Sequence, residues 1–241
     1  MATRIEKDFL GTKEIPDDAY YGVQTLRGKE NFHITGIPMS LEPNFVKAFG
    51  YVKKAAALAN RDLGVLDAKV ANAIAGACDR LIAGEMREQF VTDFIQGGAG
   101  TSTNMNANEV IANLALEALG HRKGEYQYVN PNDHVNFGQS TNDVYPTAFR
   151  LALILRLASY MQALTRLQDA FFAKGKEFEK VLKMGRTHLQ DAVPMSLGQE
   201  FHGWGTTIGE EVQRIAEVRA FLHEINLGAT AIGTTVTAAP G

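Results

Sequence analysis

The spacing of apolar residues predicts a mainly helical chain. Apolar side chains recur every three or four positions over residues 44–64 and again over residues 67–84, so we expect two antiparallel helices. A third helix is predicted from about residue 104 to Gly120, because glycine suits the left-handed position just past a helix end. The first forty residues carry turn-forming Gly and Pro, which favour turns and short extended pieces.

Longer helices are predicted in the second half, over residues 142–182 and 196–225. Four glycines fall in the first half of the last helix: Gly198, Gly203, Gly205 and Gly209. Each costs about 1 kcal/mol against alanine inside a helix, so we expect a neighbouring helix to approach closely there. Long helices that pack this closely are typical of a bundle.

These elements predict an all-α fold. Residues 1–140 are expected to form an N-terminal helical domain, which includes an ordered loop over residues 120–139. Residues 141–241 are expected to form the first long helices of a central multi-helix bundle. The boundary near residue 140 rests on helix length alone.

Composition excludes several classes of protein. With 24 Lys and Arg against 27 Asp and Glu, the formal net charge is -3, so no broad cationic surface for nucleic acid or anionic lipid is expected. The apolar segment over residues 151–161 is too short to span a membrane. The single cysteine, Cys78, cannot form an intramolecular disulfide, and the charged N-terminus does not resemble a signal peptide. We therefore expect a cytoplasmic protein.

Hydroxyl and amide side chains gather in three clusters beside glycine, over residues 97–104, 139–143 and 185–191. The first two lie at predicted helix N-termini, where free N–H groups and the helix dipole favour an anion. Ser, Thr and Asn are also ordinary helix caps, and glycine-rich turns are common loops. His188 belongs to the third cluster, at a turn, and could face a cleft or simply be structural.

At these clusters the sequence resembles the aspartase and class II fumarase family. The segments are QGGAGTSTNMNANEV at residues 96–110, NPNDHVNFGQSTNDVYPTA at residues 130–148 and KMGRTHLQDAVPMSLGQEF at residues 183–201. The resemblance covers essentially the whole chain. The GGAGTS form, the opening PDDAYYGVQTLR and KGEYQYVNPNDHVN look like aspartase members, whereas fumarases tend to carry TGSGTQ.

The resemblance implies a lyase that eliminates ammonia from L-aspartate to give fumarate through an aci-carboxylate intermediate. It implies no cofactor, because preorganised hydrogen-bond donors stabilise the developing charge. It also implies a homotetramer whose active sites combine residues of more than one chain. Fumarate hydratase remains an alternative, as does a non-catalytic helical oligomerisation module.

Six substrate-binding residues are implied by position in the motifs: Thr101, Ser140, Thr141, Asn142, Thr187 and His188. Thr101, Ser140 and Thr141 would contact the carboxylate that becomes the aci form. Asn142 and His188 would lie near the amino group, with Thr187 close by. His188 is the candidate catalytic residue, either transferring a proton or only orienting the amine. Residues 130–133 resemble a second anion site of fumarases.

One part of the family pattern is missing from the 241 residues. The family's base is a serine in a mobile loop of the form GSSxMPxKxNP, and nothing in this sequence matches it. We therefore expect the chain to be a fragment that lacks the catalytic base.

Overall fold

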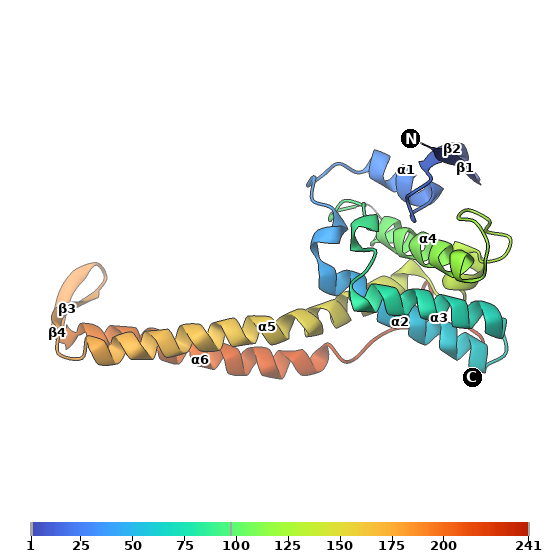
Figure 1. Ribbon diagram of the computed structural model, residues 1–241. Coiled ribbons are helices and arrows are strands. Elements are labelled where there is room, and N and C mark those ends of the chain that lie inside the picture. Colours follow the sequence, from blue (N-terminus) through green and yellow to red (C-terminus); the bar gives the residue numbers. More distant parts are fainter. Residues whose placement is uncertain (1, 97, 241) are drawn as a thin grey trace. The chain divides into compact units, whose positions relative to one another are not determined.

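The computed structural model describes residues 2–96 and 98–240 (Figure 1). Its contacts divide the chain into two compact units. The first comprises the described residues up to Leu153 together with those from Ile225 onward, and the second is Ile154–Glu224. The division falls inside helix α5 (Thr141–Glu177), whereas the sequence placed a domain change near residue 140. The domain assignment itself stays a prediction.

The first unit is built on three helices: α2 (Pro43–Asp62), α3 (Ala68–Ala83) and α4 (Thr101–Ala118). Helix α2 packs along α3, and α3 packs on α4, as the apolar spacing predicted for the first pair (Figure 1). The Asp67 side chain caps α3 by accepting the N–H groups of Lys69 and Val70, and Gly84 ends it at φ +94°. These bounds confirm the predicted helices to within a few residues.

Two small sheets correct the all-α prediction. Strands β1 (Thr3–Asp8) and β2 (Gly11–Pro16) pair antiparallel, as do β3 (Leu182–Thr187) and β4 (Gln190–Ser196). The chain also contains short helical turns: 3-10 turns at Met39–Leu41 and Arg87–Gln89, and a π-helical turn at Pro131–Val135. The chain remains mostly helical, so the fold class holds in its coarser form.

A buried carboxylate of α4 holds helix α1 (Val23–Asn31) in place. Helix α1 has no side-chain cap of its own. Instead the Glu109 carboxylate accepts the N–H groups of Gly22, Gln24 and Thr25 at 2.8, 2.8 and 3.0 Å. These bonds satisfy donors that a helix start leaves free, so α1 is fixed against α4. In Figure 1, α1 and the β1–β2 hairpin lie across α4 from α2 and α3.

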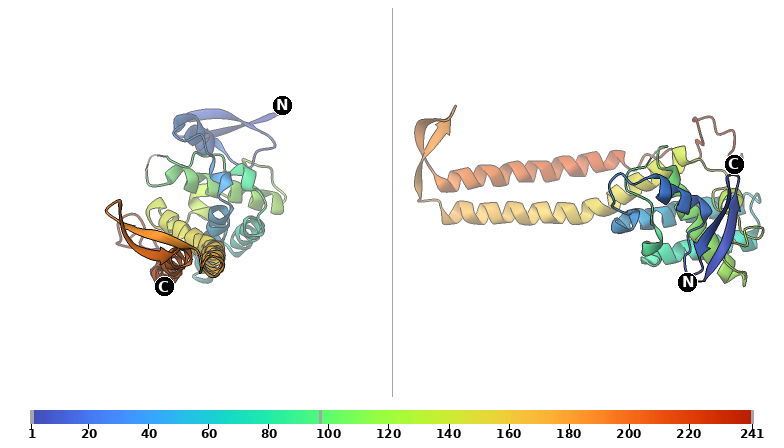
Figure 2. Two further views of the ribbon diagram at one scale, coloured as in Figure 1. Left: turned by 90° about the vertical axis from the view of Figure 1, so that its left-hand side faces the viewer. Right: turned by 90° about the horizontal axis from the view of Figure 1, so that it is seen from above.

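The second unit pairs the later part of α5 with α6 (Leu197–Phe221), which runs beside it (Figures 1 and 2). The β3–β4 hairpin joins the two helices. Helix α5 ends at Glu177 and not at residue 182, and α6 ends at Phe221 and not at residue 225. Residues 178–181, which the sequence assigned to α5, form a turn that leads into the hairpin at Leu182.

Glycines allow α5 and α6 to approach closely. A Cβ on Gly198 would collide with the carbonyl oxygen of Gly175, one on Gly205 with the Phe172 ring and one on Gly209 with the Gln168 side chain. The prediction of close helix approach is therefore confirmed at these three glycines. It is wrong for Gly203, where an added Cβ meets no atom within 4 Å.

Candidate active site

The N-terminal ends of α4 and α5 lie against each other in the first unit. Gly100, directly before α4, has φ +95°, and a Cβ there would overlap the ring of Tyr145. One turn further, the Asn104 side-chain amide donates to Thr141 Oγ1 at 3.0 Å. The positive dipole ends of two helices therefore meet at one place, which suits an anionic ligand, although several of the first-turn N–H groups already donate within the protein, such as Thr103 to Gln96 and Asn142 to Ser140.

Thr101 lies in the first turn of α4. Gly98, Ala99 and Gly100 precede it with φ values of +71°, +52° and +95°, and this left-handed stretch turns the chain into the helix. The Thr101 hydroxyl donates to the Gly98 carbonyl at 2.7 Å, and the residue is exposed. Gly97, which the sequence placed in the same cluster, lies outside the described residues.

Ser140 and Asp143 cap the start of α5 reciprocally. Ser140 Oγ accepts the Asn142 N–H at 3.2 Å, while the Ser140 N–H donates to Asp143 Oδ1 at 2.9 Å. Ser140 and Thr141 are half-buried and Asn142 is exposed. Their hydroxyl and amide groups thus lie at a defined helix start.

A segment from the far end of the chain completes this region. The second Asp143 oxygen accepts the N–H groups of Gly228 and Thr230 at 3.1 and 2.8 Å. The Asn142 side chain donates to the Ala231 carbonyl at 2.8 Å. Asp143 is fully buried, so these backbone donors replace the water that its charge has lost.

A buried lysine lies behind the meeting point of the two helices. Lys53 of α2 has no solvent exposure, and its Nζ donates to Asn136 Oδ1 at 2.8 Å and to Gln139 Oε1 at 3.0 Å. Burial lowers the pKa of Lys53 to about 7, and the nearby Cys78 and Asp143 act in the opposite direction. Sequence reasoning missed this group, although a lysine four residues after Phe49 on an apolar face was a usable signal.

This buried lysine predicts an unusual dependence of stability on pH. Because the folded-state pKa of about 7 is below the ordinary 10.5, the folded chain binds fewer protons than the unfolded chain between those values. The Lys53 contribution to the free energy of unfolding should therefore rise with pH above about 7, and its slope should approach about 1.4 kcal/mol per unit once the folded lysine has lost its proton. Denaturant unfolding of the complete protein and of Lys53→Met would measure it, with the rise absent in the variant.

Lys54→Met is the matched control, since Lys54 is partly exposed and pairs with Asp79 at 2.6 Å. Its stability should keep the wild-type dependence on pH. Glu109, whose pKa burial raises to about 7, and Cys78, whose pKa burial raises to about 12, contribute with the opposite sign but are present in all three proteins, so the Lys53 effect is the difference between wild type and Lys53→Met. A rise that persists in Lys53→Met would assign the effect to another group.

The remaining predicted residues, Thr187 and His188, belong to the second unit. His188 and Leu189, at φ +49° and +62°, form the tight turn between β3 and β4. Both Thr187 and His188 are exposed, and Arg186 pairs with Asp191 beside them at 3.3 Å. The predicted turn is thus the tip of a β-hairpin. Thr101, Ser140, Thr141 and Asn142 all belong to the first unit.

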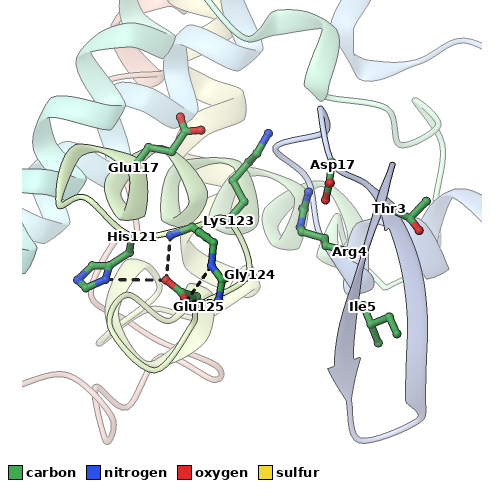
Figure 3. Close-up of a pocket in the computed structure, with 10 residues that line it drawn as sticks. Thr3, Arg4, Ile5, Asp17, Glu117, His121, Lys123, Gly124 and Glu125 are labelled. Atoms are coloured by element: carbon green, nitrogen blue, oxygen red, sulfur yellow. Dashed lines mark hydrogen bonds and ion pairs between the residues drawn. The ribbon is translucent and has the colours of Figure 1, made fainter. Parts of the chain in front are cut away.

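Two cavities of the first unit lie apart from these residues. The one in Figure 3, of about 730 Å³, is lined by residues 3–5, Asp17, Glu117 and residues 121–125, and within it Glu125 pairs with Arg122 at 3.1 Å and lies 3.9 Å from His121. The other, of about 640 Å³, is lined in part by residues 130–133. These are the residues that resemble a second anion site of fumarases. Asn130 there caps the π-helical turn by accepting the N–H groups of Asn132 and Asp133.

Neither a metal-ligand cluster nor a membrane-spanning helix is found in the part of the chain that the structure describes. Across residues 2–96 and 98–240, no three or more His, Cys, Asp or Glu side chains come together as metal ligands. No helix in that part of the chain is long and apolar enough to cross a membrane.

Comparison with known proteins identifies the family. Residues 11–241 match the protein-family model described as Lyase. The chain is 60% identical over 241 residues to aspartate ammonia-lyase of Pseudomonas aeruginosa, covering 100% of this chain and 51% of that protein. It is 56% identical over 232 residues to aspartate ammonia-lyase of Escherichia coli K12, covering 96% of this chain and 48% of that protein.

Solved structures agree with these relatives. Fumarate lyase:delta crystallin from Brucella melitensis bound to cobalt has a TM-score of 0.94 at 55% identity, covering 99% of this chain and 52% of that one. Class II fumarase from Schistosoma mansoni has a TM-score of 0.89 at 37% identity, covering 100% of this chain and 50% of that one.

The chain therefore belongs to the lyase family, as the sequence motifs predicted. The chain is 55 to 60% identical in sequence to aspartate ammonia-lyases. The chain spans about half the length of the curated relatives it matches.

Proposed function

We propose that this chain is part of an enzyme that eliminates ammonia from L-aspartate to give fumarate. The observation that carries the proposal is the meeting of two helix N-termini that present neutral hydroxyl and amide groups. The identity to aspartate ammonia-lyases supports the choice of substrate. The complete enzyme is proposed to be a cytoplasmic homotetramer with active sites shared between chains.

The proposed mechanism uses this end of the first unit to stabilise charge. A base removes the proton from the carbon next to the side-chain carboxylate, and that carboxylate takes up the charge as an aci-carboxylate before ammonia leaves. Thr101, Ser140 and Thr141 are proposed to donate hydrogen bonds to it, and Thr101 would do so by exchanging its present bond to the Gly98 carbonyl for one to the substrate. One well-placed donor of this kind lowers the barrier by about 3 kcal/mol.

The amino group is proposed to lie near Asn142 and His188, with Thr187 close by. Asn142 already donates to the Ala231 carbonyl, so its side-chain oxygen remains available to accept from an ammonium group. His188, at the exposed tip of the β3–β4 hairpin, would either transfer a proton or orient the leaving amine. The base is proposed to be a serine of the family's mobile loop, which these 241 residues do not contain.

The experiment that tests the function compares substrates. The complete enzyme should form fumarate, detected by its ultraviolet absorbance, from L-aspartate and not appreciably from malate. Fumarate hydratase is the second candidate, which the likeness to the Schistosoma mansoni fumarase favours. Preferential turnover of malate would establish that candidate in place of the first. A non-catalytic module would turn over neither and would bind no dicarboxylate.

A further inference from the structure

A chain of hydrogen bonds runs from Lys53 through Asn136 and Asn104 to Thr141. Which group donates and which accepts is fixed at each step of this chain. Lys53 Nζ carries N–H donors whether it is charged or neutral, and the Gln139 backbone carbonyl can only accept. Asn136 must therefore present its Oδ1 to Lys53 Nζ, at 2.8 Å, and its own Nδ2 donates to the Gln139 carbonyl at 3.1 Å. The orientation of the Asn136 amide is thus set from two sides.

The orientation of the Asn104 side-chain amide follows from that of Asn136. Because Asn136 Oδ1 is an acceptor, Asn104 must turn its Nδ2 toward it, at 3.1 Å, and the same Nδ2 reaches Thr141 Oγ1 at 3.0 Å. In this orientation Asn104 Oδ1 is buried and has no hydrogen-bond partner among the described residues. An unsatisfied buried acceptor is costly, and a flipped amide would place two oxygens against each other at Asn136.

The network leaves the Thr141 hydrogen free. A hydroxyl has one hydrogen to donate and accepts through its lone pairs. Thr141 Oγ1 accepts from Asn104, and within the described part of the chain its own hydrogen has no protein acceptor. Thr141 is half-buried at the start of α5, so this hydrogen is available to a ligand at the helix end.

We propose that Asn104 is a positioning residue that keeps the Thr141 hydroxyl a donor toward the substrate carboxylate. The proposal rests on the proposed function, in which Thr141 stabilises the aci-carboxylate. Asn104 itself does not touch substrate. It acts by turning its Nδ2, and not its Oδ1, toward the Thr141 oxygen, so that the Asn104 oxygen does not take the hydrogen that the intermediate needs.

Asn104→Asp in the complete enzyme tests the polarity without changing the shape of the side chain. The new carboxylate would accept the Thr141 hydrogen in place of donating to Thr141. We expect kcat to fall by about a hundredfold, as for loss of one donor to a developing oxyanion. The KM for L-aspartate should change much less, because the bond is strongest in the transition state.

Asn108→Asp is the matched control. Asn108 lies one turn along α4, is fully buried, donates to the same Asn136 Oδ1 at 3.3 Å and also has an unpartnered Oδ1. It does not hydrogen-bond to Thr141. This variant places the same charge and the same oxygen against Asn136 Oδ1 but keeps the Asn104 amide that donates to Thr141, so its loss of kcat should be about tenfold smaller than that of Asn104→Asp. An equal loss of kcat in both variants would overturn the proposal.

A double-mutant cycle supplies the second test and does not require a buried carboxylate. Asn104→Ala should lower kcat by about tenfold alone, yet add nothing in a Thr141→Val background, because the residue acts through that hydroxyl. Losses that multiply would overturn the proposal even if Asn104→Asp failed to fold. A wild-type enzyme without activity on L-aspartate would instead contradict the proposed function, so the two failures are distinguishable.

Discussion

The 241-residue chain, purified alone, is expected to form fumarate from L-aspartate about a thousandfold or more slowly than the complete enzyme. The proposed serine base and its loop are absent from these residues, and a positioned base typically contributes up to about 10⁴-fold. The helix ends of the first unit would still bind part of a dicarboxylate. Steady-state ultraviolet assays of both proteins at equal active-chain concentration would measure the difference.

Light scattering on the same sample is the companion measurement. In the second unit, apolar side chains such as Leu182, Val193 and Phe221 are 82%, 66% and 71% exposed. Apolar surface of this kind favours association, so the isolated chain should form oligomers or aggregates and not a clean monomer. Fumarate formation at the full rate by the isolated chain would show that the base lies within this sequence, and the proposed site would be wrong.

Thr101→Ala and Ser140→Ala are each expected to lower kcat of the complete enzyme by about a hundredfold. Each change removes a hydroxyl donor from the junction of α4 and α5, where charge is proposed to develop. Ser140→Ala also removes the cap of α5 and should cost about 1 kcal/mol of stability, so the assay belongs well below the unfolding temperature. Initial rates over a range of L-aspartate concentrations would separate kcat from KM.

Thr101→Ser provides the control for this experiment. It keeps the hydroxyl that donates to the Gly98 carbonyl and removes only a methyl group. Activity should therefore stay within about tenfold of wild type, while Thr101→Ala loses it. Equal rates for the alanine and serine variants would remove the Thr101 hydroxyl from the site.

Periodicity predicted the helices of the first unit because each buries one face. The stripe through Phe45, Phe49 and Val52 is visible in the sequence, and all three side chains are buried in α2. The β3–β4 hairpin was missed because residues 182–196 alternate only weakly and carry Gly185 and Pro194. Backbone pairing, with a register shift between Met184 and Arg186, forms this hairpin, and no apolar spacing encodes it.

In the candidate site, too, the sequence predicted the features that depend on neighbouring residues and missed those that depend on distant ones. Local chemistry placed Thr101 and Ser140 at helix starts, because hydroxyl caps and glycine are short-range signals. The contacts that lock the site join distant positions: Lys53 with Asn136, and Asp143 with Gly228. A single sequence holds no signal for which distant polar groups will meet, so those partners became apparent only in the folded chain.

The hydrogen bonds from Gly228 and Thr230 to Asp143 limit where the length of this chain can change without disturbing the start of α5. The bonds return the chain to the start of α5 after the whole of Ile154–Glu224 has been traversed. Paired insertions or deletions of helical turns in α5 and α6 within that segment would leave both anchor points unchanged. A change in the length of the second unit would therefore leave the residues at the helix ends unaltered and move only those it carries, such as Thr187 and His188, whereas a single inserted residue between Asp143 and Thr147 would disturb the helix ends directly.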